Sequence, residues 1–177
     1  MAASAMVTVA IVAQRVKKRP LRTAYAKEGL DLMKSRQISD KEGERTFVLI
    51  YEAGEAFHEP LVSLANQNHL GASQFTAIGA FRAANIGYFD REQRDYIKFT
   101  LREQVEVLTL NGNITLSENL TPKIHAHVIL GRKDASVRGG HLFDAEVWPT
   151  LELVLTESPQ YLRRRFNPEI GLALLEV

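Results

Sequence analysis

The sequence contains no cysteine. A disulfide framework, a thiolate metal site and a cysteine nucleophile are therefore excluded. Any bound metal ion must be held by histidine and carboxylate side chains. The chain also lacks a glycine-rich phosphate loop, a Ser-His-Asp arrangement and internal repeats, and its sequence pattern does not indicate a second domain. At 177 residues it is long enough for one domain with a hydrophobic core.

Long apolar runs are missing as well. The longest weakly apolar stretch, residues 2–13, is too short to cross a bilayer, and its basic residues follow it rather than precede it as in a secretory signal. A membrane anchor is the less favoured alternative. We expect residues 1–36 to be a disordered leader or an over-extended start upstream of Met33, and the protein to be cytoplasmic without membrane contact.

An excess of positive charge on the folded part is also missing. The formal net charge of +1 conceals eight basic and two acidic residues within positions 1–36, which leaves −5 for the remainder. Proteins that grip nucleic acid through phosphates usually present a basic face. The charge distribution therefore argues against DNA binding by the folded domain, although the basic leader keeps that alternative open.

What the sequence does contain is a series of strand patterns. Residues 46–51 are rich in β-branched and aromatic residues, and residues 95–101 alternate between polar and apolar ones, so each range predicts a strand. Pro60 suits the first turn of a helix over 59–67. Gly79 and Gly87 predict bulges or close backbone approach within a strand-like segment. Further strands are predicted at 73–90, 105–110, 124–130 and 147–155, the last interrupted by Pro149.

These patterns predict an α+β domain, a mainly antiparallel β-sheet flanked by one or two helices. We place the domain at residues 37–157 and a tail that packs on it, or on a neighbouring subunit, at 158–177. Asn111-Gly112-Asn113 is interpreted as a turn that closes the preceding strand. The triplet 163–165, three arginines, is interpreted as a solvated patch.

Three histidines predict a metal site. His125 and His127 are two residues apart, so on a strand they point to the same face. His141 follows Gly139-Gly140, whose permissive backbone is expected to turn the chain back toward the first two rings. Three histidines are a sufficient protein ligand set for a metal with an open position. The alternative is a pair of ordinary polar residues on an exposed strand face.

Other candidate residues are weighed against structural roles. Glu106 lies in an otherwise apolar strand and is either a general base or orienting carboxylate, or one half of an ion pair with Arg45 or Arg82. Asp144 either supports the metal site or forms a turn. His58 and His69 are assigned to the surface or to the ends of the helix, and Trp148 is assigned to the core or to a subunit interface.

Seven ordered blocks, taken together, resemble a known family, the plants and prokaryotes conserved (PPC) domain, also called DUF296. The blocks span roughly residues 45–157. They are Gly54-Glu55, Ile78-Gly79-Ala80-Phe81, residues 86–90, residues 106–113, His125-Ala126-His127, Gly139-Gly140-His141-Leu142 and residues 152–155.

The resemblance implies an antiparallel sheet flanked by helices and assembly as a homotrimer. It also implies that His125, His127 and His141 are the metal ligands of the prokaryotic branch, since plant members usually lack them and carry AT-hooks. Lys18-Arg19-Pro20 lacks the core of that hook. The favoured function is a metal-binding protein, with zinc expected and a small-molecule or regulatory role. The alternatives are a DNA-binding regulator and a metal-dependent hydrolase or lyase with Glu106 as base.

Overall fold

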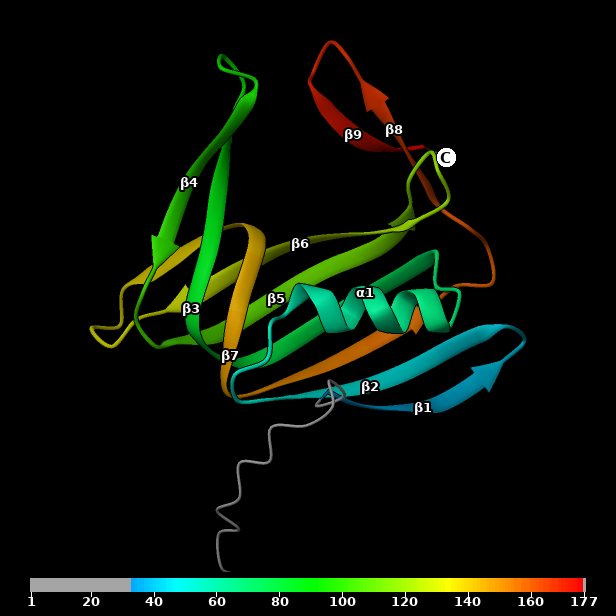
Figure 1. Ribbon diagram of the computed structural model, residues 1–177, viewed down its shortest axis with the longest axis horizontal. Coiled ribbons are helices and arrows are strands. Elements are labelled where there is room, and N and C mark those ends of the chain that lie inside the picture. Colours follow the sequence, from blue (N-terminus) through cyan, green and yellow to red (C-terminus); the bar gives the residue numbers. More distant parts are fainter. Residues whose placement is uncertain (1–32, 177) are drawn as a thin grey trace, which may run out of the picture. The chain divides into compact units, whose positions relative to one another are not determined.

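A computed structural model describes residues 33–176. Within them lie one helix and nine strands, a mainly antiparallel α+β fold, as predicted (Figure 1). The elements are β1 (Lys34–Lys41), β2 (Glu44–Glu52), α1 (His58–Gln67), β3 (Ala72–Asp90), β4 (Asp95–Leu101), β5 (Val105–Leu116), β6 (Pro122–Gly131), β7 (Val137–Glu157), β8 (Arg163–Asn167) and β9 (Leu172–Glu176). No helix in this part of the chain is long and apolar enough to cross a membrane.

The predicted leader falls mostly on residues 1–32, which lie outside the described part. Its last residues are an exception, because β1 begins at Lys34 and pairs antiparallel with β2, Lys34 opposite Ile50. The strand was not predicted, since it is almost entirely polar and exposed on both faces. An edge strand of this kind carries no alternating pattern from which it could be recognised.

Two long strands organise the sheet. The first part of β3 pairs with β5 and with the second part of β7, and its later residues pair with β4 and with the first part of β7. β6 lies between β5 and the first part of β7. This arrangement brings residues near positions 125 and 141, on different strands, into one neighbourhood.

Glycine at position 79 marks the predicted irregularity. The register of β3 against β5 shifts between Ala77 and Gly79, and a Cβ on Gly79 would lie 2.3 Å from the carbonyl oxygen of Thr150. Its φ of +146° belongs to a region that other residues rarely adopt. The predicted close approach of a backbone is therefore confirmed at Gly79, whereas Gly87 is crowded by a side chain, the ring of Phe143.

The predicted turn at Asn111-Gly112-Asn113 is wrong, because β5 continues through it to Leu116. Gly112 pairs with Phe75 on one side and Ala126 on the other. A Cβ there would lie 2.3 Å from the Phe75 ring and 2.6 Å from the carbonyl oxygen of His125. Glycine is therefore required by lateral packing inside the sheet and not by turn geometry.

The core forms between the inner sheet face and the helix. Leu61, Leu64 and Ala65 share the buried face of α1, and Phe57, just before the helix, packs near the rings of Phe75 and Phe81. Removing this apolar surface from water is the main source of stability.

Candidate metal centre

Strand alternation sets the orientation of the first two histidines. On β6, His125 and His127 alternate with Ala126 and Val128, which are 1% and 2% exposed and belong to the core. Since successive strand residues point to opposite faces, both imidazoles project away from the core on the same side. This is the arrangement that the sequence predicted.

The third histidine comes from the neighbouring strand. His141 on β7 lies opposite His127 in the antiparallel pairing of β6 and β7. The predicted role of the diglycine is wrong: Gly139 and Gly140 lie within β7, and the chain reverses earlier, where the N–H of Arg132 donates to Ser136 and that of Ala135 to Arg132. Gly140 instead permits close packing, because a Cβ there would lie 2.5 Å from the carbonyl oxygen of Gly87.

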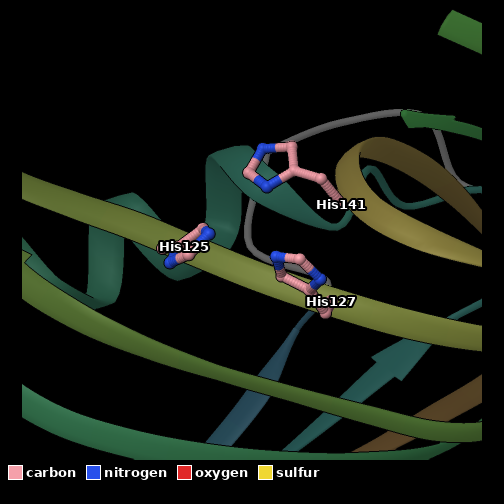
Figure 2. Close-up of side chains that lie close together, drawn as sticks. All are labelled: His125, His127 and His141. Atoms are coloured by element: carbon pink, nitrogen blue, oxygen red, sulfur yellow. The ribbon is translucent and has the colours of Figure 1, made fainter. Parts of the chain in front are cut away.

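The three rings converge on one point (Figure 2). Their centroids are 5.1 Å apart for His125–His127 and His125–His141, and 5.5 Å apart for His127–His141. One nitrogen of each ring lies within 4.8 Å of the other two. Nitrogens around a tetrahedral zinc ion are roughly 3.3 Å apart, given Zn–N distances of about 2.0–2.1 Å. Small ring rotations would therefore suffice for all three to reach one ion.

The surroundings of His125 and His141 favour the neutral form of both rings. Burial, followed by the charges of Arg164 and His127, lowers the pKa of His125 to about 4. Burial, followed by His125 and His127, lowers the pKa of His141 to about 4. Neutral imidazole is the form that binds metal. Among the described residues, the buried Nδ1 of His141 also has no hydrogen-bond partner, which is costly unless a ligand completes it. The donor set thus fits a divalent cation.

A residue that sequence reasoning missed lies beside the three rings. Arg164 on β8 places Nη2 3.0 Å from Nδ1 of His125 and 3.0 Å from Oδ1 of Asn113. Its Nε donates to the hydroxyl of Thr115 at 3.1 Å, and its Nη1 to the carbonyl of Ala173 at 3.0 Å. The prediction of a solvated arginine patch is therefore wrong for Arg164. Strand alternation across residues 163–165, where only the middle arginine is half-buried, is the signal that would have distinguished it.

A cavity of about 510 Å³ opens onto His125, His141 and Arg164. Its wall includes Tyr96, whose ring lies 4.9 Å from that of His141 between centroids. The cavity is further lined by Lys123, Ile124, Phe166 and Leu172. The candidate centre therefore has space beside it for a small molecule.

Glu106 is not brought to this centre. It pairs with Gly131 on β6, whereas His125 pairs with Asn113, seven residues further along β5. At about 3.4 Å per residue that is roughly 24 Å. The side chain is exposed, and among the described residues it forms no ion pair with Arg45 or Arg82; Arg82 pairs with Glu146 at 3.1 Å. The geometry gives no support to Glu106 as a base at these histidines.

The remaining candidates surround the centre without joining it. Asp144 is exposed on β7, opposite Asn85, and its charge tends to raise the pKa of His58. Burial outweighs this and lowers the pKa of His58, at the start of α1, where Nδ1 is buried without a hydrogen-bond partner among the described residues. His69 lies just beyond the helix. Trp148 is 42% exposed, which rules out the core and leaves the subunit interface as its predicted place.

Comparison with known proteins adds a family match. A model of the Plants and Prokaryotes Conserved (PCC) domain matches residues 38–159. No curated protein matches the chain significantly. Among solved structures, a metal-containing protein from Archaeoglobus fulgidus is 35% identical, with a TM-score of 0.69, covering 75% of this chain and 93% of that one.

Two further structures are similar. A plant- and prokaryote-conserved protein from Pyrococcus horikoshii is 30% identical, with a TM-score of 0.70 over 75% of this chain and 92% of that one. A candidate DNA-binding protein from Ralstonia eutropha JMP134 is 29% identical, with a TM-score of 0.69 over 74% of this chain and 90% of that one.

Proposed function

Because the chain belongs to the Plants and Prokaryotes Conserved domain family, we propose that it is a metal-binding member of that family. In this proposal His125, His127 and His141 hold one divalent cation, expected to be zinc. The observation that carries the proposal is the convergence of three imidazole nitrogens within 4.8 Å of one another. The 35% identical relative from Archaeoglobus fulgidus, described as metal-containing, adds support.

The chemistry of the ligand set suggests what such a centre does. An ion held by three imidazoles keeps a position open and acts as a Lewis acid toward a group that binds there. The chain itself supplies the three imidazoles, the ring of Tyr96 that lies against His141, and the adjacent cavity. These features favour a small-molecule binding or regulatory role.

Metal analysis of the purified protein tests the proposal. We expect about one zinc ion per chain in the wild type and none in the His125→Ala/His127→Ala double variant, because one imidazole alone holds zinc weakly. The control is His69→Ala, which removes an exposed imidazole outside the cluster and should leave the metal content unchanged. Equal metal content in the wild type and the double variant, or none in either, would contradict the proposal.

We further propose that the chain assembles as a homotrimer. Support comes from an apolar row, defined as four exposed apolar side chains on neighbouring strands of the sheet: Val154 on β7, Ile78 on β3, Leu108 on β5 and Ile129 on β6. These side chains are 45%, 60%, 53% and 45% exposed. Exposed apolar side chains that gather on one part of a protein surface often mark an interface. On β6, the two histidines project from the same side as Ile129, so the interface would lie close to the centre.

DNA binding is the second candidate, favoured by the description of the Ralstonia eutropha relative. The acidic balance of residues 37–177 opposes it. A mobility-shift titration of the full chain and of residues 33–177 at two salt concentrations would decide. Specific binding that survives removal of residues 1–32 would favour a DNA-binding regulator, and binding that requires the basic leader would assign the contact to that segment.

A further inference from the structure

The charge of Arg164 has no counter-charge in the described part of the chain. No carboxylate of residues 33–176 lies within ion-pair distance of its guanidinium. Its neighbours are neutral groups: a carbonyl, a hydroxyl, an amide and the ring of His125. Arginine remains protonated in proteins. A half-buried cation without an anion is costly and indicates a missing partner.

The hydrogen bond to His125 cannot coexist with a metal ion on that histidine. Arginine has donors only, so Nδ1 of His125 must accept from it. If His125 offers Nδ1 to a cation, that lone pair is used. If it offers Nε2, the single proton of the neutral ring moves to Nδ1. Nδ1 is then a donor opposite an N–H donor of Arg164, and no hydrogen bond can form between them. In either case Arg164 loses an acceptor next to the centre.

Arg164 also has donor capacity to spare. A guanidinium has five N–H donors, and four acceptors contact this one. Once His125 is committed to a cation, two N–H groups are available. These groups are one on Nη1 and one on Nη2, and donors on both terminal nitrogens of a planar guanidinium suit a carboxylate.

The cavity that these groups share has a matching character. Lys123 adds a second positive charge, while Ile124, Phe166 and Leu172 supply apolar wall. One acidic residue, Glu118, also lines the cavity, and its carboxylate accepts the backbone N–H of Phe166. A cationic end beside an apolar wall suits an organic acid better than inorganic phosphate, which offers no apolar part to bury.

We propose that the metal centre binds a small organic carboxylate, with Arg164 as the residue that holds the carboxylate next to the ion. The inference rests on the proposed metal site and extends it to a ligand class. Arg164 lies outside the family match, which ends at residue 159. The family match therefore carries no information about Arg164, and the proposed role rests on the contacts of β8 in this structure.

The test uses the full chain loaded with Co²⁺, with benzoate as the probe. Benzoate binding is measured by calorimetry and by the change in the visible Co²⁺ spectrum. The variants are Arg164→Gln, Arg164→Lys and the matched control Arg163→Gln, which removes the same charge from an exposed neighbour. Benzamide, which has the same ring without the charge, and inorganic phosphate are the comparison ligands. Metal titration of every variant, with circular dichroism, establishes that each is folded and loaded.

We expect benzoate to bind the wild type and Arg163→Gln with affinities within about twofold, and to bind Arg164→Gln roughly tenfold or more weakly. Arg164→Lys should bind with intermediate affinity because it keeps the charge without the planar fork. Loaded protein that ignores benzoate, binds benzamide or phosphate better, or binds benzoate unchanged in Arg164→Gln overturns the carboxylate proposal alone. A wild type that takes up no metal overturns the proposed function and this inference with it.

Discussion

The imidazoles of His125 and His141 are arranged so that protons are excluded and a lone pair remains. Burial is the largest cause of the lowered pKa in both rings, and the electrostatic effect of the neighbouring imidazoles and of Arg164 adds to it. A ring that resists protonation is available to a cation over a wider pH range than an ordinary histidine. In the metal-free protein the same feature lowers stability at acidic pH, because the unfolded chain protonates these two histidines more readily than the folded chain does.

Metal-free protein should therefore lose stability as the pH falls from about 6.5 to about 4. The folded pKa values of His125 and His141, about 4, lie below the ordinary 6.5, so protons favour the unfolded chain within that window. Urea midpoints at pH 7, 6, 5 and 4.5 would measure the loss. It should be smaller in His125→Gln/His141→Gln and unchanged in His69→Gln. A slope in the double variant equal to that of the wild type would show that these rings are not responsible.

At the scale of the element, Gly112 of β5 links sheet packing to the position of His125. Gly112→Ala would force a Cβ against the Phe75 ring and the His125 carbonyl. We expect a loss of about 2–3 kcal/mol in the free energy of unfolding and weaker metal binding, since the backbone of β6 must shift. Chemical denaturation and metal titration check this. Asn111→Ala, an exposed neighbour, should change stability by only about 0.5 kcal/mol. Equal stabilities would refute the packing role.

Glu157 at the end of β7 ties the sheet to the segment after the helix. Its carboxylate is 2% exposed and accepts from the N–H groups of Gly71 and Ala72 and the hydroxyl of Ser73. Glu157→Gln places an amide donor among these donors, so we expect a loss of about 2–3 kcal/mol in unfolding free energy. Glu152→Gln, on the exposed face of the same strand, is the matched control. Similar denaturation midpoints for the two variants would contradict this role.

Elements with strong local patterns could be predicted from the sequence. β4 has the bounds that the alternation at 95–101 predicts, and α1 begins one residue before the predicted helix. The two β6 histidines could be paired because alternation is a local property. By contrast, β8 and β9 are short and pair chiefly with each other, and the position of Arg164 beside His125 depends on where that hairpin lies. Such a long-range contact has no signal in the local pattern.

The roles of several glycines also could not be predicted from the local sequence alone. Gly79 could be recognised as a site of close backbone approach, but Gly112 and the Gly139-Gly140 pair were interpreted as turns. A glycine in a turn and a glycine crowded by a neighbouring strand look alike in the sequence. Only the register of β5, β6 and β7 distinguishes them.

At the scale of the whole molecule, the apolar row of Val154, Ile78, Leu108 and Ile129 should control assembly. Light scattering of the wild type should give about 60 kDa, three times the chain mass of 19.9 kDa. Ile78→Glu would bury a charge in the interface and should shift the mass toward a single chain. Tyr88→Glu, which places the same charge on an exposed part of β3 outside the row, is the control. A trimer that survives Ile78→Glu would place the interface elsewhere, and a monomeric wild type would refute the assembly.

The proposed metal site and the carboxylate ligand both require one ion held by three rings. The most direct measurement is anomalous scattering at the zinc edge from crystals of the zinc-loaded protein. The account predicts one peak per chain, about 2.0–2.1 Å from a ring nitrogen of each of His125, His127 and His141. Zinc bound elsewhere, or a peak that fewer than all three of these histidines contact, would contradict it.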